Sequence, residues 1–205
     1  MSAFEFFFSF YGLLLGLSVA ELVSGFSRVL HERERIRFGW LAPLLAVFVA
    51  IDIATFWNQA WVIFRGAPFN FALLVLGLIV AGTFYVAASV TFPRVAMEGR
   101  DVDLDDHFWA QRRIVFGCVL AANLLIALTF FAITGLSGEI GQIALGPTFW
   151  IGLAIFICGT SIGAFAGNRK LVIGALLVLV AYHLFTTARA LNVLIQAGGW
   201  SLLQG

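Results

Sequence analysis

Residues 69–92 read FNFALLVLGLIVAGTFYVAASVTF, a stretch of 24 residues without a charged side chain. A helix needs roughly 20 mostly apolar residues, at a rise of about 1.5 Å per residue, to cross the ~30 Å hydrocarbon core of a bilayer. This stretch is long enough to do so. It therefore predicts a membrane-spanning helix.

Five further segments meet the same criterion, so the chain is predicted to be an all-α membrane protein. We expect a six-transmembrane-helix bundle that forms a single integral membrane domain over residues 1–205. The composition agrees, with 61% hydrophobic and 11% charged residues, whereas soluble domains have about 45–50% and about 25%. The predicted spans are residues 6–30, 39–64, 69–92, 109–134, 148–167 and 171–196.

The first apolar segment is expected to be a span and not a cleavable signal. No basic region precedes it. Its apolar run also continues beyond the roughly 7–15 residues of a signal-peptide core.

The distribution of Lys and Arg predicts the orientation of the bundle. Ten cations flank the connections after spans one, three and five, whereas the opposite side has Arg65 alone and Arg189 lies inside the last span. Cationic connections stay in the cytoplasm, so both termini are predicted to be non-cytoplasmic, in a multi-pass protein of a bacterial inner membrane. The ten cations are Arg28, Arg33, Arg35, Arg37, Arg94, Arg100, Arg112, Arg113, Arg169 and Lys170.

Three polar residues are expected near the middle of the bilayer. Asp52 and His183 lie about twelve or thirteen residues into their predicted spans, and Asn123 is slightly shallower. A charged group at this depth costs ~2.5–3.5 kcal/mol on insertion scales, so such groups usually face the protein interior. The three residues are therefore candidates for an intramembrane polar cluster.

Arg189 and Gln59 complete this candidate cluster. Arg189 lies ~9 Å further outward than His183, at the level of Gln59, and Asp52 and Gln59 share a helix face at a spacing of seven. We expect a polar seam between the second and sixth spans, with Asp52 paired to Arg189 or His183. Such a seam is either a satisfied ion pair that fixes helix register or a proton or ion pathway.

A second candidate group lies nearer the cytoplasmic side. Glu21 and Arg28 share a face of the first span, and Tyr85 of the third span lies at a comparable depth. Arg28 is expected to reach the headgroups as an anchor. Glu21 is either the access carboxylate of a pathway or a hydrogen-bond partner of Tyr85.

Small residues at a spacing of four predict two close-packing faces. Such faces bring helix backbones together in membranes, because lipid supplies no hydrophobic driving force between helices. They are expected to pack within the bundle or, alternatively, to form a homo-oligomer interface. The first span carries Gly12, Gly16, Ala20 and Ser24, and the fifth carries Gly159, Gly163 and Gly167.

The 94–108 loop contains an acidic cluster. Its Asp-x-Asp-x-Asp spacing lacks the glycine and the terminal glutamate of a calcium loop, so no metal site is expected. Asp105 or Asp106 is instead predicted to cap the fourth span. The rest of the cluster is a candidate docking surface for a cytoplasmic protein partner.

Motifs for catalysis, cofactor binding or nucleic-acid binding were not found in the sequence. We therefore expect no enzyme activity, no cofactor and no nucleic-acid partner. Two hypotheses remain. The chain is a non-catalytic membrane component, meaning a scaffold, assembly or sensory subunit, or it is a small transporter or channel for a proton, ion or small anion.

Overall fold

The computed structural model describes residues 3–64, 70–94, 102–134 and 146–196. Two very short strands, β1 (Ile36–Arg37) and β2 (Val102–Asp103), accompany the helices in this part of the chain. The described residues are otherwise mainly helical, and the six helices follow the order of the predicted spans. They are α1 (Ala3–His31), α2 (Leu41–Phe64), α3 (Phe71–Thr91), α4 (Leu104–Thr134), α6 (Pro147–Phe165) and α7 (Arg169–Gln196).

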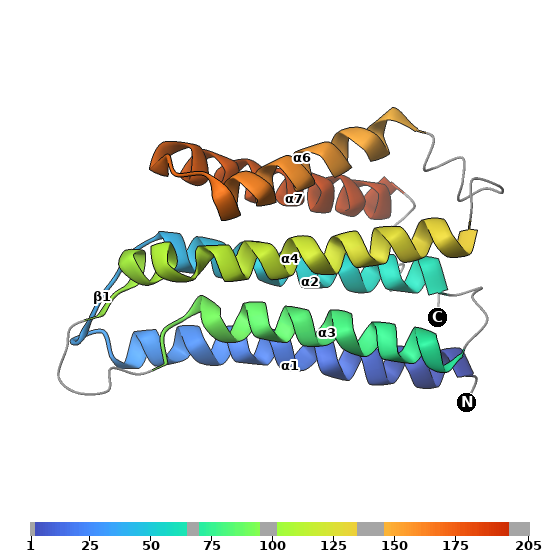
Figure 1. The fold of residues 1–205 in the computed structure, drawn as a ribbon, viewed down its shortest axis with the longest axis horizontal. Coiled ribbons are helices and arrows are strands. Elements are labelled where there is room, and N and C mark those ends of the chain that lie inside the picture. The colour runs from blue at the N-terminus through green and yellow to red at the C-terminus, as the bar shows by residue number, and fades with distance from the viewer. Residues whose placement is uncertain (1–2, 65–69, 95–101, 135–145, 197–205) are drawn as a thin grey trace.

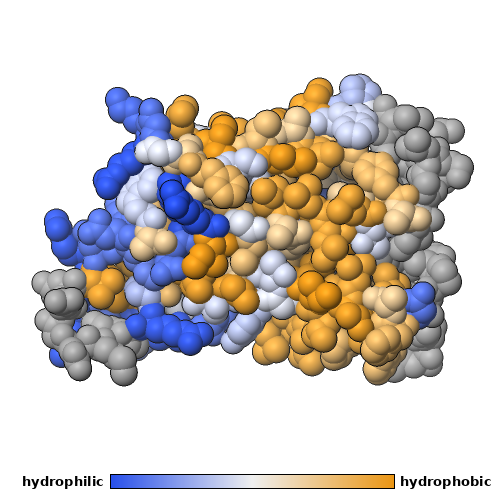
Figure 2. Space-filling model, in the orientation of Figure 1, coloured by the Kyte–Doolittle hydropathy of each residue, from blue (hydrophilic) through white to orange (hydrophobic). Residues whose placement is uncertain are grey.

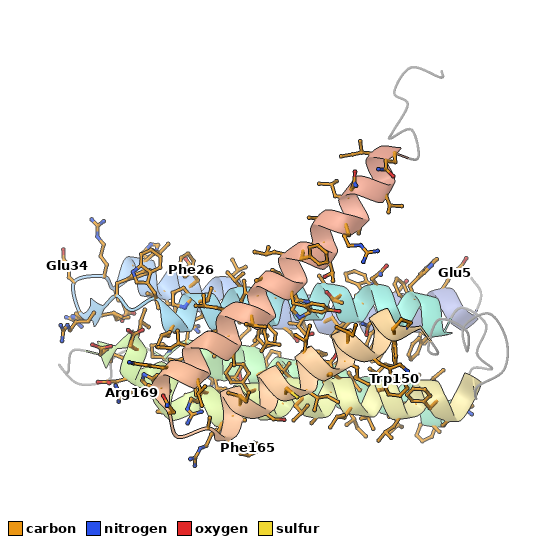
Figure 3. The ribbon with its side chains drawn as sticks, turned by 90° about the horizontal axis from the view of Figure 1, so that it is seen from above. Glu5, Phe26, Glu34, Trp150, Phe165 and Arg169 are labelled. Carbon is orange, nitrogen blue, oxygen red and sulfur yellow. The ribbon has the colours of Figure 1, made fainter. Side chains whose placement is uncertain are left out.

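The helices lie in three tiers (Figure 1), and α7 crosses the other helices obliquely (Figure 3). One outer tier holds α1 and α3, the middle tier holds α2 and α4, and the other outer tier holds α6 and α7. The central helix α2 contacts α1, α3, α4 and α7. Its side chains supply much of the buried core, including Phe48, which packs on Phe116 of α4, and Phe56, which packs on Phe84 of α3.

Five of these helices are long and apolar enough to cross a membrane, namely α1, α2, α3, α4 and α7. The remaining helix, α6, has a shorter apolar part, Phe149–Phe165. Hydrophobic residues cover most of the length of the face shown in Figure 2, and hydrophilic residues gather at the end that carries β1. By helix length and hydropathy the chain is a multi-pass membrane protein whose apolar helices contact lipid.

The end of the bundle that carries β1, called here the hydrophilic end, is held together by contacts between distant segments. β1 pairs in parallel with β2, with Ile36 opposite Val102. Asp103 accepts hydrogen bonds from the backbone N–H groups of Asp105 and Asp106 at 2.9 and 3.3 Å. Asp103 therefore caps the first turn of α4.

The prediction that Asp105 or Asp106 caps the fourth span is wrong. The helix begins at Leu104, five residues before the predicted start, so both residues lie within its first turn. Asp105 Oδ1 instead accepts a hydrogen bond from the backbone N–H of Leu41 at 3.1 Å. It thereby caps α2, a helix that begins 64 residues earlier in the chain.

Glycines of α6 pack against neighbouring helices of the same chain. A Cβ atom at Gly159 would meet the side chain of Leu179 in α7, and one at Gly163 would meet the ring of Phe116 in α4. Gly167 lies beyond the helix end in open space. The first two glycines thus serve packing within the bundle.

The small-residue face of α1 is used differently. Gly12 packs against the ring of Trp57 in α2, whereas no described residue lies within 4 Å of a Cβ atom built at Gly16. Ala20 and Ser24 are also exposed. Most of this face therefore points away from the rest of the chain.

Candidate functional site

Asp52 of α2, Asn123 of α4 and His183 of α7 meet inside the bundle. The Asn123 amide donates one hydrogen bond to Asp52 Oδ2 at 3.0 Å and one to the Val119 carbonyl at 3.0 Å. An amide NH₂ group has two donors, so both are used. The Asp52 carboxyl group thus links α2 to α4 by a hydrogen bond.

His183 completes this buried cluster without a hydrogen bond. Its Nε2 atom lies 3.7 Å from Asp52 Oδ1, which is within ion-pair distance but too long for a hydrogen bond. Neither ring nitrogen has a hydrogen-bond partner among the described residues. The ring lies among the aromatic rings of Phe48, Phe156 and Tyr182, with centroids 5.6, 6.3 and 6.0 Å away.

The cluster is enclosed by protein. Asp52 is 2% exposed and His183 is 4% exposed. Two hollows of about 340 and 370 Å³ open on the described surface, and residues of the hydrophilic end line both of them. Neither hollow is lined by Asp52, Asn123 or His183.

Arg189 and Gln59 do not join the cluster. Six residues of helix separate Arg189 from His183 by about 120° around the helix axis, so the two side chains leave α7 on different sides. The Arg189 guanidinium lies 6.0 Å from the ring of Phe185. The C-terminal part of α7 projects away from the other helices (Figure 3), and Gln59 of α2 is exposed.

Glu21 forms an ion pair within its own helix. Its Oε1 atom accepts a hydrogen bond from Arg28 at 3.3 Å. Tyr85 is exposed on α3, and no hydrogen bond between Tyr85 and Glu21 is found among the described residues. Glu21 and Tyr85, the two residues of the predicted access group, are therefore not hydrogen-bonded to each other in the described structure.

Arg112 is a buried group that the sequence reasoning placed among the loop cations. It is 6% exposed and reaches from α4 to the end of α6, where its guanidinium donates to the carbonyls of Gly163, Ala164 and Ala166. The last carbonyls of a helix lack partners within that helix. Arg112 donates hydrogen bonds to these carbonyls. In the sequence, its position directly before a long apolar run indicates that it can belong to the fourth helix.

The acidic cluster at the hydrophilic end does not form a metal site in the described part of the chain. Within the described residues, no group of three His, Cys, Asp or Glu side chains is placed to hold a metal ion. Asp103 and Asp105 of the acidic cluster are engaged in the caps described above. Asp101 and most of the 94–108 loop before it lie outside the described residues.

In comparisons of the chain with protein-family models, with curated proteins and with solved structures, nothing matches. The function must therefore be inferred from the geometry of the chain itself.

Proposed function

We propose that this chain is a non-catalytic component of a membrane assembly, in which Asp52, Asn123 and His183 hold helices in register. The observation that carries the proposal is the enclosure of the cluster. An ion pathway needs a water-accessible route to its polar groups, whereas Asp52 is almost completely buried and takes its partners from two other helices.

Two apolar surfaces support a role in assembly. The face of α1 that contains Gly16, Ala20 and Ser24 lacks close neighbours within the described chain. Most described side chains of α7 after His183 are exposed, with Leu191, Val193 and Ile195 each more than half exposed. Small-residue faces are common at helix contacts in membranes, so these surfaces suit packing against other membrane helices.

The proposed topology has six spans, with both termini outside and the hydrophilic end in the cytoplasm. Although α6 is short, its 19 residues measure about 28 Å, close to the ~30 Å hydrocarbon thickness. Trp150 and Phe165 mark its two ends, and the helix runs along α4 for much of the bundle (Figure 3). Arginine at the hydrophilic end favours the cytoplasmic side.

A flux assay combined with a mass measurement tests this proposal. Purified chain is reconstituted in liposomes that contain a pH-sensitive dye, and its mass in mild detergent is measured by light scattering. We expect proton leakage equal to that of protein-free vesicles. In detergent we expect material heavier than the 22.3 kDa of one chain. Monomeric protein without flux would count against the assembly role.

One observation favours a second candidate, a proton or ion transporter. The ring nitrogens of His183 lack hydrogen bonds among the described residues while one of them lies 3.7 Å from a carboxylate oxygen. Such a pair could exchange a proton. Proton flux that disappears in a folded Asp52→Asn variant and survives in an Asn58→Ala variant would establish this candidate and reject the structural role.

A further inference from the structure

A hollow of about 340 Å³ opens at the hydrophilic end, where the chain passes from α1 into β1. This volume is within the range of about 300–1,000 Å³ that is usual for small-molecule sites. Its polar lining consists of Arg33, Arg35 and Arg37 with a single acid, Glu34. Three positive groups against one negative group favour an anionic ligand.

The arginines have donors to spare. Arg33 and Arg35 are exposed, and Arg37 forms an ion pair with Asp103 at 3.8 Å, a distance longer than a hydrogen bond. A guanidinium presents five N–H donors in a planar fork that matches the oxygens of a phosphate. Among the described residues, Glu34 and Asp103 offset part of this charge, and the three arginines leave a net positive charge that suits a phosphate.

The backbone that carries these arginines is held in place. The N–H groups of Arg35 and Ile36 both donate to the carbonyl of Glu32, at 2.8 and 3.0 Å. The Arg35 carbonyl accepts from Val102 at 3.1 Å, and β1 pairs with β2 directly after it. A site that is already ordered loses less conformational entropy when a ligand binds.

Exposed aromatic rings lie directly beside the arginines. Phe38 lines the hollow, and its ring meets that of Trp40 edge-on with centroids 5.3 Å apart. Trp40 is 76% exposed and immediately precedes the apolar helix α2. Aromatic rings at this boundary are typical of the membrane interface, where a headgroup joins its acyl chains.

We propose that this hollow binds the phosphate of an anionic phospholipid. Arg33, Arg35 and Arg37 contact the phosphate oxygens, and Phe38 and Trp40 lie along the first part of the acyl chains. The recognised chemistry is a phosphate ester, which free phosphate compounds share with lipid headgroups. The aromatic pair is the feature that selects the lipid. This proposal is independent of the assembly role.

Native mass spectrometry of the full chain in detergent tests the arginine contribution. The chain is titrated with phosphatidylglycerol and with phosphatidylcholine of the same acyl composition. We expect preferential binding of phosphatidylglycerol, and a loss of roughly five-fold in affinity for each arginine in the variant Arg33→Gln/Arg35→Gln/Arg37→Gln. The matched control, Arg113→Gln/Arg169→Gln/Lys170→Gln, removes the same charge from exposed positions at the same end and is expected to bind normally.

Equal losses in the two triple variants, or equal binding of the two lipids by the unmodified chain, would overturn the site. If the glutamine variant does not fold, as judged by circular dichroism, the corresponding triple lysine variant replaces it. That variant keeps the charge but loses the planar fork. Its affinity for phosphatidylglycerol is expected to fall, and unchanged affinity would also overturn the proposal.

A second arm separates lipid from free phosphate compounds. The variant Phe38→Ser/Trp40→Ser is expected to bind phosphatidylglycerol several-fold more weakly and to retain whatever affinity the unmodified chain has for soluble glycerol phosphate. If the aromatic variant binds the lipid normally, the lipid assignment is rejected and the site is one for a soluble phosphate ester.

Discussion

At the scale of single residues, the candidate cluster illustrates what depth along a span can predict. Polar groups are costly at the predicted midplane, so depth predicts that Asp52, His183 and Asn123 face the protein interior, and these residues lie together in the structure. Arg189 was selected by the same depth argument, but a similar depth does not imply a shared direction. Its position around α7 and the divergence of that helix from α2 keep it away from Asp52.

The hydrogen bond between Asn123 and Asp52 can be measured with a double-mutant cycle. We expect Asp52→Ala and Asn123→Ala to lower the free energy of unfolding by amounts that do not add. The coupling energy should be about 0.6–1.7 kcal/mol, the upper part of the range for polar contacts between membrane helices. Unfolding in mixed micelles provides the measurement, with exposed Asn58→Ala as control. Additive effects would show that the pair does not tie α2 to α4.

The buried guanidinium of Arg112 is expected to stabilise the junction between α4 and α6. In Arg112→Met, three carbonyls at the end of α6 lose their donor. Leaving buried acceptors unpaired should lower the free energy of unfolding by about 1–3 kcal/mol. The neighbouring Arg113→Met is the matched control because Arg113 is exposed. Equal thermal stability of the two variants would contradict this role.

At the scale of helices and strands, apolar length was a good guide to the number and order of helices but a poor guide to where α4 begins. The charged residues before residue 109 predict a loop, yet Asp103 caps a first turn of α4 that carries Asp105 and Asp106. Acids are favourable at that end of a helix. The pairing of β1 with β2 could not be predicted, because two-residue strands have no periodic pattern and depend on contacts between distant segments.

The contact between α6 and α4 depends on the small size of Gly163, so a larger residue there is expected to destabilise the protein. Gly163→Ala places a methyl group against the ring of Phe116, and overpacking of this kind typically costs about 1–3 kcal/mol. Gly82→Ala in α3 is the control, since none of the residues that the structure describes lies within 4 Å of its Cβ position. Thermal unfolding in detergent should show a lower midpoint for the first variant only. A Gly163→Ala variant at least as stable as the control would argue against close packing of the two helices.

At the scale of the whole molecule, hydropathy and the distribution of arginine support the proposed arrangement of six spans. The hydrophilic end gathers the beginnings of α2, α4 and α7 and the ends of α1, α3 and α6. The Asp52 cluster lies well inside the apolar length, and the lipid site proposed above lies where that length begins. The contacts that close the hydrophilic end, such as Asp105 to Leu41, depend on the three-dimensional fold and were beyond sequence reasoning.

Cysteine labelling in intact cells tests the six-span arrangement most directly. In a background with Cys118→Ala and Cys158→Ala, single cysteines replace Glu34, Phe71, Pro147 and Asn168. A membrane-impermeant maleimide should label Phe71→Cys and Pro147→Cys in intact cells, and Glu34→Cys and Asn168→Cys only after permeabilisation. Labelling of Pro147→Cys and Asn168→Cys from the same side would show that α6 does not cross, and the reverse pattern would place the arginine-rich end outside.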